Sequence, residues 1–237
     1  MKEISEKLRN TILAAIPTTN LVLFYAPLYG TNPTIIDRIL AANNGTFTNP
    51  KWKTLKNGLV VPSYDGTAYI KNSTANWRSA DSQGAIGVWF KTGSVASRNL
   101  FASCDEASAT RYLTINKAAT LNVLLVNQRN NDTRDTVAGA TNVSDSKWHS
   151  VFLTSDGSVW AILLDGVPET LTVTSGLNTG DWFADTSARD NFTVGVQIAN
   201  VAAFYWDGQI GLVVVYSVAP TTAQILRMSN RLKGVFH

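Results

Sequence analysis

The residues on which metal sites and disulfide frameworks depend are scarce in this sequence of 237 residues. Its one cysteine, Cys104, leaves no partner for a disulfide within the chain, and its two histidines are His149 and His237. A closed zinc site needs four ligands, mostly Cys and His. We therefore expect neither a disulfide-stapled fold nor a structural zinc site.

Long apolar stretches are also missing. The longest runs, WAILL (160–164) and IGLVVVY (210–216), are far shorter than the about 20 residues that span a bilayer, so we expect no membrane span. The N-terminus carries charges through its first nine residues and has no clean apolar core, which is not the pattern of a signal peptide. The net charge of +3 is scattered along the chain, so nucleic acid is not an expected partner.

Short strand patterns fill most of the sequence. From residue 21 to residue 217, Val, Ile, Phe, Tyr and Trp recur in short runs, and several runs are separated by Asp-Gly pairs, which suit tight turns. Many short strands without intervening helices predict an antiparallel β-sandwich or barrel. The Asn- and Asp-rich stretches 127–136 and 141–146 are expected to be long loops.

A helical pattern opens the chain. In residues 2–16, Ile4, Leu8 and Ile12 recur every four positions among charged residues, which predicts an amphipathic helix. An apolar stripe of this kind packs either on a partner or on the helix's own domain. Both alternatives stay open at this stage. In the first, the stripe is an assembly element that binds other virion proteins or further copies of this chain.

A second helical pattern closes the chain. Thr221 and Gln224 have the spacing of a capping box, and the apolar residues that follow fall on one face of a short helix over 222–232. No linker or repeat divides the strand-rich region. We therefore divide the chain into an N-terminal helix and linker, 1–19, and one β domain, 20–237.

His149 stands beside Ser150 in the run WHSVFLT, and Asp156 follows in the next turn. Alternation along a strand sends His149 and Ser150 to opposite faces, whereas a nucleophile and its base must lie within hydrogen-bonding reach. Asp156 is roughly 23 Å away at the rise of a strand. We interpret His149 as a structural residue in a β-hairpin over 147–164.

The hairpin is one of six segments that follow one another along the chain: LVLFYAPLYGT (21–31), NNGTFTNPKW (43–52), VPSYDGTAYI (61–70), GAIGVWFKTG (84–93), the WHSVFLT hairpin (147–166) and FYWDGQIGLVVVYSVAPTTAQI (204–225). In this order they resemble laminin-G-like domains and their relatives in the concanavalin A-like superfamily. The resemblance covers residues 20–232 and implies a jelly roll of two large antiparallel sheets, with Trp89, Trp148 and Trp206 filling the space between them.

The superfamily also contains glycoside hydrolases of the laminarinase type. These place their two carboxylates on one strand in a Glu-x-Asp-x-x-Glu pattern, about 5 to 5.5 Å apart in retaining enzymes. The four glutamates of this chain do not fit the pattern. Asp105 and Glu106 are adjacent, and a strand would send them to opposite faces. We expect a protein without catalytic residues.

Calcium is the remaining metal to consider, because some relatives hold it through loop oxygens. The candidate acids are Asp132 with Asp135, and Asp181 with Asp185. Calcium takes six to eight oxygen ligands, and neither pair matches a spacing with a known mechanism. We expect no cofactor, and calcium is not supported by the spacing.

A sugar-binding site needs an aromatic ring and polar groups that satisfy hydroxyls. The polar stretch from Asn127 to Arg134 has the second, and two tryptophans in polar surroundings offer the first. The predicted ligand-binding residues are Trp77, Gln128, Arg129, Asn131, Asp132, Arg134 and Trp182.

The sequence indicates a non-catalytic surface recognition or decoration module. An extracellular-type domain with Met1, no export signal and an amphipathic helix in front is typical of proteins released by lysis, so we expect a bacteriophage virion protein of the capsid, tail or fibre. Its expected partners are glycans, other virion proteins and its own copies as a homo-oligomer. A secreted lectin and a laminarinase-type hydrolase are the alternatives.

Overall fold

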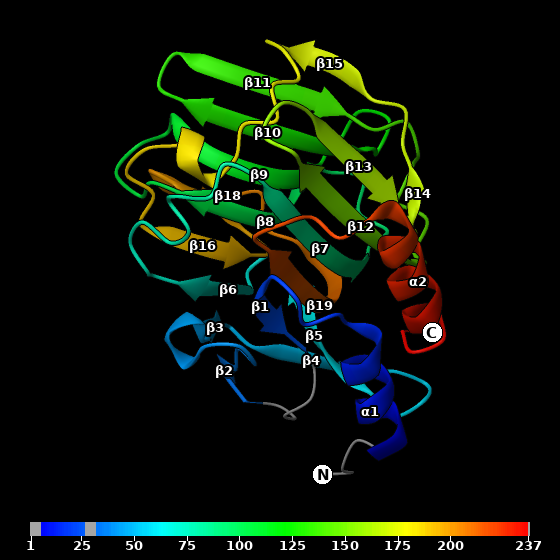
Figure 1. Cartoon of the computed structure of the whole chain (residues 1–237). Helices are drawn as coiled ribbons and strands as arrows, with labels where there is room; N and C mark the ends of the chain where they lie inside the picture. Colours follow the sequence, from blue (N-terminus) through cyan, green and yellow to red (C-terminus); the bar gives the residue numbers. More distant parts are fainter. Residues whose placement is uncertain (1–5, 27–31, 237) are drawn as a thin grey trace.

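Two antiparallel sheets stacked face to face make up the computed structural model, which describes residues 6–26 and 32–236 (Figure 1). The predicted all-β sandwich with a helix at each end is confirmed. Sheet A has the order β14 (Val167–Pro168), β13 (Trp160–Leu164), β12 (Trp148–Ser155), β7 (Gly84–Lys91), β19 (Asp207–Tyr216), β5 (Val60–Asp65) and β4 (Lys51–Thr54), and β1 (Leu21–Tyr25) also pairs with β19.

Sheet B faces sheet A across the core. A short hairpin of β17 (Gln197–Ala199) and β18 (Val201–Ala203) stands outside both sheets, and single helical turns occupy Ala41–Asn43 and Phe183–Asp185. The order of sheet B is β15 (Thr172–Ser175), β11 (Thr133–Ala138), β10 (Leu124–Asn130), β9 (Arg111–Lys117), β8 (Arg98–Cys104), β16 (Asn191–Val194), β6 (Tyr69–Asn72), β3 (Gly45–Thr48) and β2 (Thr34–Ile35).

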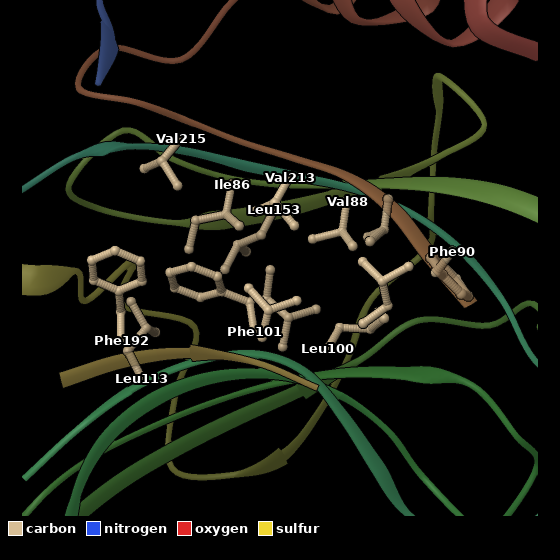
Figure 2. Packing of buried hydrophobic residues seen from close by; sticks show 14 of the residues in the cluster. Ile86, Val88, Phe90, Leu100, Phe101, Leu113, Leu153, Phe192, Val213 and Val215 are labelled. Atoms are coloured by element: carbon tan, nitrogen blue, oxygen red, sulfur yellow. The ribbon is translucent and has the colours of Figure 1, made fainter. Parts of the chain in front are cut away.

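The main core lies between the sheets, and alternation along each strand supplies it. In β7, Ile86 and Val88 point inward, and the side chains of sheet B that meet them include Phe101 and Phe192 (Figure 2). All four are almost completely buried. Removing this much apolar surface from water is the dominant stabilising contribution to such a sandwich.

Sheet A is buried on its other face as well. The helices α1 (Glu6–Ala15) and α2 (Thr222–Lys233) lie side by side over it (Figure 1). Trp89 and Trp148 pack in this second apolar layer, where Trp148 contacts Phe236 with ring centroids 5.0 Å apart. The prediction that these two tryptophans lie between the sheets is wrong, because they occupy the outward positions of β7 and β12. Trp206 does lie between the sheets, as predicted.

The N-terminal helix packs on its own chain. Ile12 is completely buried against sheet A and α2, Leu8 packs against the same cluster, and Arg231 of α2 donates a hydrogen bond to the carbonyl of Ala14 at 3.1 Å. The stripe expected to bind a partner is therefore already covered at Leu8 and Ile12. Ile4 lies outside the described residues.

The C-terminal helix begins at the predicted cap. The side chain of Thr221 accepts a hydrogen bond from the backbone N–H of Gln224, and Gln224 Oε1 accepts one from the backbone N–H of Thr221. Ile225, Met228 and Leu232 are buried on the face toward sheet A. The capping box therefore fixes where the helix starts, and its apolar stripe fixes which face lies on the sheet.

The predicted hairpin forms from β12 and β13, and His149 and Ser150 point to opposite faces of it. The ring of His149 lies between two carboxylates, with Nδ1 2.8 Å from Asp165 Oδ2 and Nε2 3.1 Å from Asp145 Oδ1. Ser150 Oγ instead lies 2.8 Å from Ser229 Oγ, under α2. Burial disfavours the charged ring, but the bonds to both carboxylates outweigh it and raise the pKa of His149.

A buried arginine ties the loops at one end of the sandwich to sheet B. Arg189 is 1% exposed, and its guanidinium donates to the carbonyls of Phe183, Thr186 and Trp77 and to Ser103 Oγ, at 2.7 to 3.2 Å. The guanidinium also lies 4.8 Å from the centre of the Phe183 ring. Because every acceptor is neutral, burial lowers the pKa of Arg189 to about 10.

Replacing Arg189 with methionine should lower the free energy of unfolding by about 3 kcal/mol, because it leaves several buried carbonyls without donors. Urea unfolding followed by tryptophan fluorescence measures the change. Arg227→Met, at an exposed position of α2, is the matched control and should stay within about 0.5 kcal/mol of the wild type. A loss below about 1 kcal/mol in Arg189→Met would show that this arginine does not hold the loops.

The bridge at His149 predicts a pH dependence of stability. A raised pKa in the folded protein means that the stabilisation is complete below the ordinary value of about 6.5 and is lost as the pH rises through the folded value. The difference in unfolding free energy between the wild type and His149→Gln should therefore shrink as the pH rises above about 6.5. Urea titrations at several pH values measure it, and a difference that grows with pH would contradict the bridge.

Candidate functional site

The polar stretch 127–136 is part of a hairpin. Residues 124–130 form β10 and 133–138 form β11, joined by the two-residue turn at Asn131 and Asp132. The expectation of a long loop over 127–136 is wrong. Polar residues occupy both faces of these strands, so the usual alternation of apolar and polar residues does not mark them in the sequence. Asn131 has a positive φ of 60°, which asparagine tolerates and such a turn requires.

Three of the predicted ligand-binding residues point into the protein. Trp77 is 6% exposed, packs on Phe192 at 4.4 Å and donates its Nε1–H to Asn43 at 3.1 Å, while Trp182 is completely buried. Gln128 is 1% exposed and bonds to Thr186 at 2.9 Å. The prediction that the two indoles form an exposed sugar platform is wrong. Their neighbours in sequence are polar, but both rings fill the end of the inter-sheet core.

The outward side chains of β9, β10 and β11 are mostly polar, but several of them are buried: Tyr112, Thr114, Asn127 and Thr136 are 2 to 9% exposed. Strand register places Tyr112, Arg129 and Arg134 in one row and Thr114, Asn127 and Thr136 in the next. Arg134 is exposed and Arg129 is half-buried. We call the following residues the polar face: Tyr112, Thr114, Asn116, Asn127, Arg129, Arg134 and Thr136.

Asn127 is the centre of the polar face. Its amide donates to Asn116 Oδ1 at 2.7 Å, and its Oδ1 accepts from Thr136 Oγ1 at 2.8 Å and from Arg134 at 3.2 Å. These bonds fix four side chains in one orientation on a rigid sheet. A ligand that binds there loses little free energy to the ordering of side chains.

The turn residue Asn131 connects the polar face to a neighbouring ion pair. Its carbonyl accepts from Arg129 Nε at 2.9 Å, and its Oδ1 accepts from Arg111 Nε at 3.0 Å. Arg111 also forms an ion pair with Asp105 at 3.0 Å. The structure therefore brings Arg129, Asn131 and Arg134 together, as the sequence predicted, and leaves Asp132 in the exposed turn beside them.

The adjacent acids considered for hydrolysis bind different partners. Asp105 is 5% exposed and pairs with Arg111, whereas Glu106 pairs with Lys71 of β6. Two carboxylates in separate ion pairs do not form the acid and nucleophile of a retaining hydrolase. Asp105 and Glu106 instead each neutralise a different cation, Arg111 and Lys71.

The acids considered for calcium are partly gathered. Asp135 is 4% exposed and accepts bonds from Leu177 N–H and Thr179, while Asp185 accepts from Trp182 N–H. Burial, and then the nearby charges of Asp185 and Asp135, raise the pKa of Asp181. Among residues 6–26 and 32–236, no group of three or more His, Cys, Asp or Glu side chains has the geometry of a metal site.

An exposed aromatic ring stands at the other end of the polar face, and sequence reasoning missed it. Phe204 follows β18, is 48% exposed and has a φ of 56°. Its carbonyl accepts from the N–H of Asn99, which pairs in register with Asn116. A positive φ is unusual for a bulky residue and costs about 1 to 3 kcal/mol. Strained, exposed residues of this kind concentrate at functional sites.

The β17–β18 hairpin covers the rest of this side of sheet B. Ala199 packs with Ala102, Cys104 and Tyr112 in a small apolar cluster, next to the first row of the polar face. The hairpin therefore covers part of the outer face of β8, whereas Arg134 of β11 is exposed. Among the described residues, no helix is long and apolar enough to cross a bilayer.

The fold is shared with several solved domains of low sequence identity. The CBM40 of the Ruminococcus gnavus IT-sialidase, bound to α2,3-sialyllactose, is 17% identical over 62% of this chain and 82% of its own, with a TM-score of 0.54. Domain 4 of AbnA, a GH43 arabinanase from Geobacillus stearothermophilus in complex with arabinotriose, is 14% identical over 89% and 98%, with a TM-score of 0.63.

A third similar structure is the binding domain of botulinum neurotoxin DC in complex with SialylT, which is 12% identical with a TM-score of 0.62 and is matched over 90% of this chain and 51% of its own. A comparison with curated proteins gave no match. A family model matches residues 64–226, from β5 to α2. The sheets, their order and this match together show that the chain belongs to the concanavalin A-like lectin/glucanase superfamily.

Proposed function

We propose that the chain is a non-catalytic glycan-binding module and that it binds sugar on the polar face of sheet B. The observation that carries the proposal is the hydrogen-bonded array on the outer side of sheet B, in which the buried amide of Asn127 holds the exposed Arg134 and the half-buried Asn116 in place. Solved domains with this fold are bound to sialyllactose and arabinotriose, which supports the same class of ligand here.

The chemistry of the face suits a saccharide. Amides offer donors and acceptors, and guanidinium groups offer planar pairs of donors, so both satisfy hydroxyl groups without a metal. Phe204 supplies an exposed ring on which the apolar C–H face of a sugar ring can pack, and its backbone carbonyl bonds to Asn99, the register partner of Asn116. The strain at Phe204 is consistent with a ring kept exposed for binding rather than for stability.

A place on a bacteriophage particle stays a prediction from the sequence. The stripe that was to attach the domain is buried by the chain itself at Ile12 and partly buried at Leu8, so Ile12 is not free to bind a virion protein or a further copy. The same glycan-binding role suits a secreted lectin, and the test below applies to either setting.

A glycan array followed by calorimetry on the best ligand tests the proposed function. Phe204→Asn removes the ring but suits the left-handed backbone, so the affinity should fall at least about tenfold, or 1.4 kcal/mol, while the unfolding free energy should not fall, because the substitution relieves strain of about 1 to 3 kcal/mol.

Val218→Asn, at an exposed position before α2, is the matched control and should bind as the wild type does. Failure of the wild type to bind any glycan would refute the proposed function. Unchanged binding by Phe204→Asn would show that the ring does not take part.

A further inference from the structure

We propose that the glycan carries an anionic group, a carboxylate or a sulfate, which binds between Arg129 and Arg134. This inference rests on the proposed function and specifies its ligand. The two arginines are directly opposite each other on β10 and β11. Both project outward, because Gln128 of β10 and Asp135 of β11 point toward the interior.

Two like charges in this arrangement repel. Side chains directly opposite in an antiparallel pair have Cβ atoms about 4.5 to 5.5 Å apart, and like charges at these positions are destabilising. The side chains around the pair on the polar face are neutral. Arg129 donates to the carbonyl of Asn131, and Arg134 donates to the amide oxygen of Asn127. Neither neutral acceptor compensates the positive charge.

Neither Arg129 nor Arg134 forms an ion pair within the part of the chain that the structure describes, and Asp132 in the intervening turn pairs with neither of them. The buried Asp135 on β11 accepts bonds from Leu177 and Thr179 instead. By contrast, Arg111, which bonds to the turn residue Asn131, has a carboxylate partner in Asp105.

An oxyanion satisfies this site. Each guanidinium has five N–H donors and uses one of them in the bonds described above, which leaves planar pairs of donors for a carboxylate or sulfate. The neutral part of the sugar then extends along the sheet toward the half-buried Asn116. The arginine pair therefore selects the charge of the ligand, and Asn116 is placed to bind a hydroxyl group.

Calorimetry with three matched probes tests the inference: lactose, 3′-sialyllactose and 3′-sulfated lactose. The wild type should bind at least one acidic probe at least about tenfold more tightly than lactose, and the preference should weaken as salt is raised. Arg129→Gln with Arg134→Gln should abolish the preference. Lys53→Gln with Arg227→Gln removes two positive charges from exposed positions elsewhere and should retain it.

The outcomes separate the inference from the proposed function. A tighter complex with the sulfated probe or with the sialylated probe supports the inference and identifies the anion. Equal binding of all three probes by the wild type overturns the anionic ligand and leaves the glycan-binding function in place. An acidic preference that survives the double arginine substitution overturns the site. Absence of binding to the probes and to a glycan array overturns both proposals.

Discussion

Burial of sheet A on both faces determines which surface of the molecule is free to bind a ligand. Strand β7 is apolar at inward and outward positions alike, so one side packs on sheet B and the other is covered by α1 and α2. Sheet B alternates apolar and polar residues, and its polar side remains outside. The proposed binding face lies on sheet B because sheet A is covered on both sides, whereas the outer side of sheet B is polar.

Polar groups stabilise the ends of the sandwich, where loops leave the apolar core. Loops that leave the core carry backbone carbonyls that need donors, and Arg189 supplies several of them from one buried side chain. On β12, the ring of His149 lies between the carboxylates of Asp165 and Asp145. Arg189 and His149 thus hold connecting segments against the sheets, which keeps the sheet that carries the array around Asn127 rigid.

The sequence predicted the features that depend on local patterns. The alternation of side chains at His149 and the capping box at Thr221 can be predicted from the sequence alone. The order of the motifs along the chain identified the sandwich. What it missed depends on tertiary contacts. Trp77 and Trp182 stand among polar neighbours, yet the fold turns both rings inward. The apolar stripe of the first helix predicts that this face packs against another surface, but the sequence alone does not tell whether that surface is the protein's own sheet or a partner.

The β17–β18 hairpin has a consequence for experiments in solution. Cys104 lies beneath it and is fully buried, and burial raises the pKa of the thiol. A thiolate is needed for alkylation, so iodoacetamide will modify the folded protein only when this hairpin lifts. The rate of Cys104 alkylation, followed by mass spectrometry, therefore measures local opening of the hairpin next to the proposed binding face without any engineered label.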